Sequence, residues 1–371
     1  MTKRFEGALY GLASCVALFV MTSLYGCHAN DVPADWKADC VGRMQLSFPS
    51  DVEVAANTAN MLEREYKLGS LQPSFDFADG QHAGWSELNY LGRLYASHPL
   101  SASERNRLAA AANQLVLQAQ NAARNKKDKT GKPLIFEELT VAPQKGVASR
   151  VDADYDVSLF VGESMIWLSA SGIDTKWDEL RKSFEIFVNG AIPRMVGEVP
   201  SMPGVCLPYA FVKDNNRPWR HIAMTYRLRE HPDITIMLRD QNAVEIDPKA
   251  NPAVYDPESI SDSFWSRYDN MYRKSLRGVW NSPYRRAKLG NSKGLESFVK
   301  IVRKDDTVDY GYLVVTKGDP AAKEDTPDLM LYVVQDSKNA KAKGIAPMEK
   351  EAFLSMAQTI AASVKRRPTS P

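Results

Sequence analysis

A segment rich in proline and glycine separates two halves of this chain that carry the same order of expected elements. Residues 197–204 contain two prolines and two glycines, which interrupt both helices and strands. On each side, the pattern of apolar residues predicts strands, a helix, further strands and a second helix. Blocks of strands and helices in this order are typical of antiparallel sheets covered by helices. We therefore expect an α+β fold of two domains with a similar plan, residues 40–196 and 197–371, each an antiparallel sheet packed with helices.

The first half opens with a short strand and contains two expected helices. Apolar and polar residues alternate over 44–48, which predicts a strand with one buried face, and a second strand is expected over 59–68. Ser101 and Glu104 have the spacing of a capping box and predict the start of a helix. The apolar side chains of 177–188 fall on one face of a second helix. Further strands are expected over residues 134–141, 154–160 and 165–169.

The second half is predicted from the same kinds of pattern. Strands are expected over residues 205–212, 221–228, 234–238, 295–302, 310–315 and 329–334. A helix is expected to begin near residue 260, with an inner face made by Phe264, Tyr268, Met271, Tyr272 and Leu276. A last helix is expected over residues 353–364.

The N-terminus has the three parts of an export signal. Lys3 and Arg4 supply positive charge, and an uncharged apolar run follows over residues 8–21. This run is shorter than the roughly 20 residues that span a membrane, and its length is typical of a signal peptide. It ends at Gly26 and Cys27, where a small residue before a cysteine resembles the cleavage box of bacterial lipoproteins. We expect residues 1–26 to be removed and the Cys27 sulfur to carry a lipid.

Two other outcomes for this segment stay open. An ordinary signal peptide could be cut a few residues later, within 28–30, and an uncleaved segment could serve as an anchor. All three outcomes place the body of the protein outside the cytoplasm, in the periplasm. With a lipid at Cys27, His28 becomes the second residue, which favours the outer membrane. Polar residues 27–39 would then form a tether between the membrane and the fold.

Composition and charge exclude some classes of protein. Apolar residues make up 44% of the chain and charged residues 25%, which is typical of a folded globular protein. After removal of residues 1–26, basic and acidic residues nearly balance. A general nucleic-acid binder or a protein that coats anionic membranes would show a basic excess. We therefore expect no nucleic-acid partner.

Cysteine use is consistent with export. Cys15 lies in the apolar run and Cys27 at the expected lipid site, so Cys40 and Cys206 are the two that remain for the folded body. In an oxidising compartment these two could form a disulfide bond. Two buried free thiols are the alternative.

No pattern of catalytic or metal-binding residues emerges. Gly162 and Ser164 begin like a hydrolase nucleophile elbow, but the second glycine is missing. The aspartates at 152, 154 and 156 resemble the start of a calcium loop without its glycine and distal glutamate. The histidines lack the spacing of metal ligands, and no glycine-rich phosphate loop is present. We expect neither an enzyme nor a bound metal or cofactor.

One group of residues is a candidate for protein binding. Tryptophan, tyrosine and arginine are enriched at the energetic centres of protein interfaces. Such residues gather in two stretches of the second half, and the candidates are Arg217, Trp219, Arg220, Arg277, Trp280 and Tyr284. The alternative for the aromatic residues is a place in the core, which we expect for Tyr268 and Tyr272.

Short motifs in both halves resemble one known family. Cys40, Gly42 and Arg43 form a Cys-x-Gly-Arg motif ahead of the alternating strand. Residues 203–206 then read Pro-Gly-Val-Cys, and residues 231–233 read His-Pro-Asp at a turn. Together they resemble the type VI secretion immunity proteins that neutralise secreted phospholipase effectors.

The resemblance implies a protein without enzymatic activity that acts on the periplasmic side. Such a protein binds its cognate phospholipase effector and blocks it, which protects the producing cell. The resemblance also implies a disulfide bond between Cys40 and Cys206. Two alternatives stay open: a cell-envelope lipoprotein with a scaffolding or ligand-binding role, and a periplasmic hydrolase.

Overall fold

The computed structural model describes residues 32–68, 74–128, 131–172 and 177–367. The expected export signal and the expected lipid site at Cys27 lie outside the described residues, as does the first part of the expected tether. No helix among the described residues is long and apolar enough to span a membrane.

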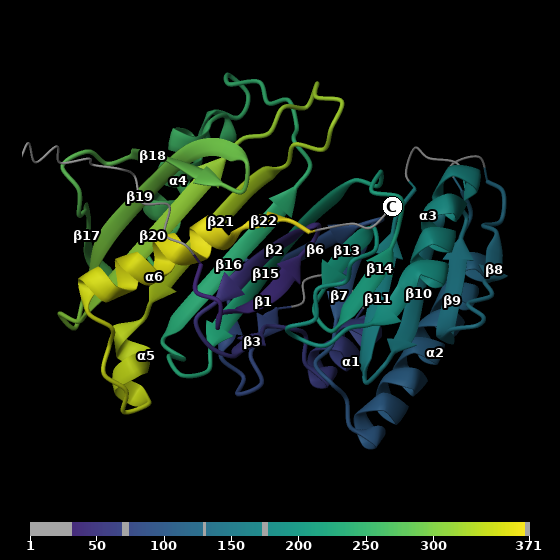
Figure 1. Ribbon diagram of the computed structural model, residues 1–371. Helices are drawn as coiled ribbons and strands as arrows, with labels where there is room; N and C mark the ends of the chain where they lie inside the picture. Colours follow the sequence, from purple (N-terminus) through teal and green to yellow (C-terminus); the bar gives the residue numbers. More distant parts are fainter. Residues whose placement is uncertain (1–31, 69–73, 129–130, 173–176, 368–371) are drawn as a thin grey trace, which may run out of the picture.

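An antiparallel sheet of 14 strands runs through most of the molecule (Figure 1). In the order of the sheet, its strands are β17 (Arg273–Gly278), β19 (Ser292–Arg303), β20 (Val308–Thr316), β21 (Asp328–Gln335), β16 (Ile234–Gln241), β15 (Arg220–Leu228), β6 (Glu87–Tyr90), β7 (Arg93–Ala96), β11 (Ser164–Ala170), β10 (Asp154–Val161), β9 (Lys145–Val151) and β8 (Phe136–Glu138). Two further strands join it from the side, β18 (Arg285–Leu289) on β19 and β3 (Val52–Val54) on β15. The expected α+β class with antiparallel sheets is confirmed.

Strand β15 joins the two halves of the chain. On one side it pairs with β16 along its length, and on the other side it pairs with β6 and β3 from the first half. Ala223 of β15, for example, lies opposite Glu87 of β6 and opposite Arg239 of β16. The two expected domains therefore share backbone hydrogen bonds, and the boundary near residue 197 stays a prediction.

Helices cover both faces of this sheet. In the first half, α1 (Ala59–Leu68) and α2 (Ala102–Asn125) pack over a cluster that includes Tyr66, Tyr95 and Trp167, and α3 (Trp177–Gly190) buries Phe184 and Phe187 elsewhere in the core. In the second half, α4 (Pro257–Arg267) and α6 (Lys350–Ser363) lie on opposite faces of the same strands (Figure 1). The two faces of these strands are therefore both buried, which explains why β21 is buried along its whole length.

Three small sheets and two short helical segments complete the described fold. Strands β1 (Lys37–Val41) and β2 (Met44–Phe48) form a hairpin that the C-terminal strand β22 (Lys365–Arg366) extends. Strands β12 (Ala191–Pro193), β14 (Ala210–Lys213) and β13 (Gly204–Leu207) form a second sheet, and β4 (Phe75–Asp76) pairs with β5 (His82–Ala83). The short segments are η1 (Pro252–Val254) and α5 (Ser337–Ala342).

Three expected elements were wrong. The single strand expected over residues 205–212 is a hairpin of β13 and β14, with a turn at Tyr209, which has a φ of +56°. Residues 59–68 form a helix instead of a strand, because Leu62 and Tyr66, four residues apart, face the core together. The helix expected to extend past residue 268 ends at Arg267, and Asp269 follows with a positive φ of 48°. Tyr272 therefore lies outside the helix with 61% of its surface exposed, and is not a core residue. Met271 is exposed in the same way, and Leu276 belongs to β17.

Other details of the prediction are confirmed. The Ser101 side chain accepts from the Glu104 backbone N–H, and the Glu104 carboxylate accepts from the Ser101 backbone N–H, so the capping box is present at the start of α2. In β2 the expected inner positions are buried and the positions between them are half-buried.

Candidate partner-binding surface

A disulfide bond ties the start of the first half to the start of the second. Cys40 of β1 and Cys206 of β13 are joined, with their Cα atoms 5.8 Å apart and a separation of 166 positions in the sequence. Both are fully buried, and they pack together with Phe211. This is the pairing that the resemblance to the immunity family implies.

Gly42 and Arg43 fix the turn that follows this disulfide. The Gly42 N–H donates to the Cys206 carbonyl, and the Cys206 N–H donates to the Gly42 carbonyl. Gly42 has a φ of +57°, and a Cβ atom there would lie 2.4 Å from Oδ2 of Asp240. The same Asp240 oxygen accepts from the Arg43 backbone N–H at 2.7 Å. The Cys-x-Gly-Arg motif is thus a junction between the two halves.

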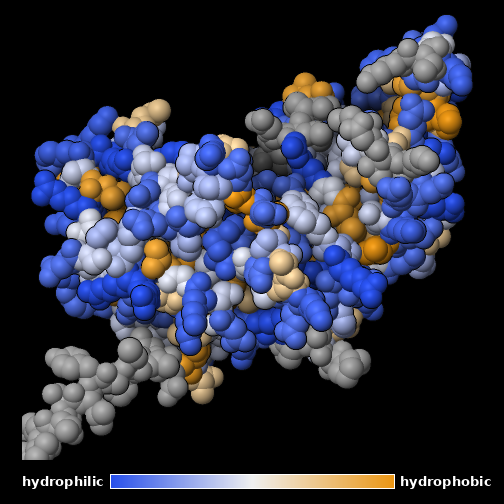
Figure 2. All heavy atoms as spheres, turned by 90° about the horizontal axis from the view of Figure 1, so that it is seen from above, coloured by the Kyte–Doolittle hydropathy of each residue, from blue (hydrophilic) through white to orange (hydrophobic). Residues whose placement is uncertain are grey.

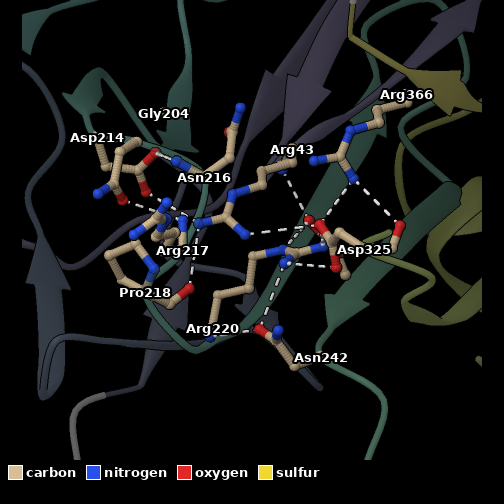
Figure 3. Close-up of polar contacts among 12 residues, drawn as sticks. Arg43, Gly204, Asp214, Asn216, Arg217, Pro218, Arg220, Asn242, Asp325 and Arg366 are labelled. Carbon is tan, nitrogen blue, oxygen red and sulfur yellow. Dashed lines mark hydrogen bonds and ion pairs between the residues drawn. The ribbon is translucent and has the colours of Figure 1, made fainter. Parts of the chain in front are cut away.

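A buried network of charges extends from this junction (Figure 3). Nη2 of Arg43 lies 3.0 Å from Oδ2 of Asp214, and the Arg220 guanidinium contacts both oxygens of Asp240 at 2.6 and 2.7 Å. Asp325 lies 2.9 Å from Arg220 and 2.7 Å from Arg366, which approaches from β22. Each carboxylate thus has an arginine partner, which is the arrangement that buried charges require.

Arg220 is therefore not a surface residue, contrary to its place among the expected partner-binding residues. None of its side chain is exposed. Burial opposes its charge, but the carboxylates of Asp240 and Asp325 more than offset this effect and raise the pKa of Arg220 above its ordinary value. The sequence showed an arginine in an aromatic, basic stretch, but not that it points inward from the first position of β15.

Its neighbours Arg217 and Trp219 do lie on the surface. Arg217 is exposed, and half of the Trp219 surface is exposed. The turn that carries them rests on the buried network, because Nη2 of Arg43 donates to the Pro218 carbonyl at 3.1 Å. Oδ1 of Asp214 accepts from the Asn216 backbone N–H at 2.7 Å. A turn fixed in this way presents its side chains at a low entropic cost of binding.

The other three candidates lie at the end of the sheet. Arg277 of β17 is exposed, and Trp280 is half-buried against Phe298. The Arg285 guanidinium lies 4.0 Å from the centre of the Trp280 ring, in a cation–π contact. The Tyr284 hydroxyl donates to Asp262 of α4. This group is mixed in character, with one exposed cation and two aromatic side chains that already have partners.

The two groups do not form one surface. Strands β19, β20, β21 and β16 separate β17 from β15. At ~4.8 Å per strand, the groups are roughly 24 Å apart. In the sequence analysis all six residues formed one candidate set because they are all tryptophan, tyrosine or arginine. The strand order places the two groups at different positions in the sheet.

Exposed apolar residues are dispersed over the face seen in Figure 2. The coloured residues there show small apolar groups, each bordered by hydrophilic side chains. Single exposed apolar residues are normal, whereas a broad apolar patch marks a site of interaction with a protein, a membrane or a ligand. On this face, a partner would therefore meet a mixed surface with small apolar anchors, which is the usual character of interfaces between independently folded proteins.

Side chains weighed for catalysis have structural contacts. Ser164 is buried at the start of β11 and does not begin a helix, as a nucleophile elbow would require. Asp154 accepts from the Ser171 hydroxyl and the Gly172 N–H, and Asp156 accepts from the Trp167 indole N–H at 3.0 Å. Within the described residues, no group of three or more His, Cys, Asp or Glu side chains is placed to hold a metal ion.

The second half of the chain matches a known family. Residues 198–369 match the family described as Tle cognate immunity protein 4 C-terminal domain. This part of the chain is therefore similar to that family of immunity proteins. Among curated proteins, none matches the chain.

Solved structures of immunity proteins share the fold of nearly the whole chain. A chain in the crystal structure of the Tle4–Tli4 complex superposes with a TM-score of 0.56 at 14% identity, over 90% of this chain and 98% of that chain. The apo structure of immunity protein TplEi of the type VI secretion system from Pseudomonas aeruginosa gives a TM-score of 0.55 at 16% identity, over 90% of this chain and 98% of that chain. The same protein in complex with an "L" peptide gives a TM-score of 0.53 at 14% identity, over 91% of this chain and 99% of that chain. The immunity-protein fold thus includes the first half, which lies outside the matched family domain.

Proposed function

We propose that this protein is an immunity protein that binds and inhibits a type VI-secreted phospholipase effector in the periplasm, and that it is not itself an enzyme. The observation that carries the proposal is the match of residues 198–369 to the Tle cognate immunity protein 4 family. The likeness of fold to the immunity proteins Tli4 and TplEi over about nine-tenths of the chain supports it.

The structure suits inhibition by occlusion. The described surface is carried by a continuous sheet with both faces packed, so little order has to be gained when a partner binds. A disulfide and a buried charge network hold the junction of the two halves. A rigid body of this size can cover the entrance to an active site without supplying any chemistry of its own.

The decisive experiment is reconstitution with a type VI-secreted phospholipase from the same organism. We expect the two purified proteins to form a complex and the phospholipase activity on vesicles to disappear at an equimolar ratio. Cells that produce the immunity protein should survive delivery of the effector to the periplasm. Absence of a complex at micromolar concentration, together with no protection of the cells, would falsify the proposal.

We also propose that the protein is exported and anchored by a lipid at Cys27, in the outer membrane. The first described strand begins at Lys37, ten residues after Cys27. A chain of ten residues reaches at most ~35 Å, so the lipid would keep the body near the membrane that a phospholipase attacks.

Replacement of the lipid site tests this anchor separately from inhibition. Cys27→Ser should release the protein from membrane fractions into the soluble periplasm and abolish labelling with radioactive palmitate. The released protein should still inhibit the effector in solution. If Cys27→Ser is processed and retained on membranes like the wild type, the anchor is elsewhere.

A further inference from the structure

A hollow of about 270 Å³ lies where the first half of the chain meets the second. Its walls come from the segment before β6, from β15 and β16, and from α4. Ala223 is part of its lining and lies between Glu87 on one neighbouring strand and Arg239 on the other. The small alanine side chain leaves space between these two larger residues, which also line the hollow.

Arg239 is unusual among the less accessible arginines of this protein. The buried ones, Arg43, Arg194, Arg220, Arg227, Arg303 and Arg367, each donate to a carboxylate or carbonyl oxygen. Nε of Arg239 is buried with no hydrogen-bond partner, and no carboxylate forms an ion pair with its guanidinium within the described residues. Burial lowers the pKa of Arg239, although Asp328 and Glu87 act in the opposite direction.

The neighbouring carboxylates have other partners. Asp328 accepts from the Lys317 ammonium group and from the Gly318 N–H. Glu87 accepts from the Asn89 amide at 2.6 Å and lies 3.6 Å from Nε2 of His221. A guanidinium that is partly withdrawn from water without a close anion is unfavourable, so the half-buried Arg239 is suited to pair with an anion from outside the protein.

The charges around the hollow favour an anionic occupant. Besides Arg239, the ionisable residues of the lining are Arg267, Glu87 and His221. Burial lowers the pKa of His221, so its imidazole is neutral at pH 7. Two positive charges therefore face one negative charge, and an incoming carboxylate would be attracted.

Aromatic residues form the rim. Trp85 has a φ of +72°, a region that bulky side chains rarely adopt, and 44% of its surface is exposed while its ring packs on Phe264 at 5.2 Å. Backbone strain of this kind is concentrated at functional sites. Trp219, half exposed, is not part of the lining, but it lies beside His221, which is, with ring centres 6.4 Å apart. A partly exposed tryptophan that lines the same hollow as an arginine is typical of the centre of a protein interface.

We propose that this hollow, which we call the Arg239 socket, receives an acidic side chain of the effector, whose carboxylate pairs with the Arg239 guanidinium. The inference rests on the proposed function and adds a contact to it. The volume is below the 300–1,000 Å³ that small-molecule sites usually occupy, and it suits a single side chain with the backbone that carries it. The aromatic rim then covers the ion pair and excludes water.

Substitution of Arg239 tests the socket. Arg239→Met keeps the length of the side chain and removes its charge, and we expect it to weaken effector binding by roughly 30-fold or more, mainly through faster dissociation. Arg239→Lys keeps a charge and should weaken binding less. Because the free protein loses an unpaired charge, the melting temperature of Arg239→Met should stay the same or rise. Arg124→Met, at an exposed arginine at the end of α2, is the matched control and should bind like the wild type.

The partner residue can then be found by double-mutant cycles. Each surface Asp and Glu of the effector is replaced by alanine and tested against wild type and Arg239→Met. One effector variant should weaken binding to the wild type and have no further effect on Arg239→Met. Unchanged affinity of Arg239→Met, or lost affinity with a lowered melting temperature, overturns the socket and leaves the proposed function standing. Failure of the wild type to bind the effector overturns the proposed function itself.

Discussion

At the scale of single residues, Gly42 has the most constrained position in the junction. Its φ is positive, its backbone pairs with Cys206, and the Asp240 carboxylate occupies the space that a side chain would need. Asp240 cannot retreat easily, because it also accepts from the Arg43 N–H and from the Arg220 guanidinium. One glycine thus decides whether the turn, the disulfide and the charge network can form together.

Gly42→Ala should therefore lower the free energy of unfolding strongly. The left-handed conformation alone costs ~1–2 kcal/mol for a residue with a Cβ, and displacement of a buried carboxylate from its arginine adds ~3 kcal/mol. Urea unfolding followed by circular dichroism measures the sum. Gly80→Ala is the matched control: Gly80 also has a positive φ, of +83°, but a Cβ there meets no atom within 4 Å. Equal losses for the two variants would show that Asp240 does not constrain Gly42.

The sequence predicted one part of this junction and could not predict the rest. A Cys-x-Gly-Arg motif is visible in the sequence, and so is Cys206. The partners of Arg43 in the motif, Asp214 and Asp240, are ordinary aspartates 171 and 197 residues away, and no local pattern marks them. Arg220 was mistaken for a surface residue for a related reason, since its inward direction depends on Asp240 of the neighbouring strand and on Asp325, 105 residues away, and neither contact is marked by a local pattern.

At the scale of elements, local periodicity predicted most strands and helices but not their ends. The strand prediction for residues 59–68 failed because ten residues with few apolar positions fit either period. Leu62 and Tyr66 favour the helix because in that conformation both side chains pack against α2 and β11. The socket was missed because its residues come from β6, β15 and β16, and strand order cannot be read from one sequence.

Asp79 offers a test of how the turn between β4 and β5 is held to the rest of the fold. Partial burial opposes ionisation of Asp79, but the Gln81 N–H, Arg227 and Lys343 lower its pKa to about 2. Arg227 lies in β15, and Lys343 directly follows α5. The ionised carboxylate therefore links a turn of the first half to two elements of the second.

A lowered pKa means that the unfolded chain binds a proton before the folded chain does. The stabilisation is complete above the ordinary pKa of about 4 and is lost as the pH falls toward 2. Because 44% of the side chain is exposed, solvent reduces the contribution to about 0.5–1 kcal/mol at pH 7. Asp79→Asn should remove this amount at pH 7 and about half of it at pH 3, measured by urea unfolding. A difference that stays constant between the two pH values would contradict the link.

At the scale of the whole molecule, the disulfide limits how far the two halves can separate on unfolding. It closes a loop between residues 166 positions apart. In the chain-entropy model such a crosslink stabilises by ~4–5 kcal/mol, with measured values often smaller. Cys40→Ala combined with Cys206→Ala should therefore lower the free energy of unfolding by an amount of this order, measured by urea unfolding. Reductant should shift the unfolding curve of the wild type toward that of the double variant and leave the curve of the double variant unchanged. Identical unfolding curves of the oxidised wild type and the double variant would show that the disulfide does not stabilise the fold.

Charge is distributed unevenly over the molecule. Residues 273–300, which include β17, β18 and most of β19, contain eight basic residues and one acidic residue, although the whole chain has a net charge of only +2. Two like-charged pairs lie directly opposite each other, Arg277 with Lys300 and Lys288 with Lys293. Such pairs destabilise a sheet, so this basic edge lowers the stability of the free protein. A basic edge of this kind attracts an acidic partner over a distance and raises the association rate.

Lys288→Gln combined with Lys293→Gln separates these two effects. The free energy of unfolding should rise by a few tenths of a kcal/mol, because the cross-strand repulsion is removed. Association with the effector should slow by ~3–10-fold at low salt and lose part of its salt dependence, while dissociation stays the same. Lys126→Gln combined with Lys127→Gln, at exposed residues after α2, is the control and should change neither rate. Since Arg239→Met is expected to act on dissociation, stopped-flow binding distinguishes attraction by the basic edge from anchoring in the socket. Unchanged association of the first double variant would show that the effector approaches another part of the molecule.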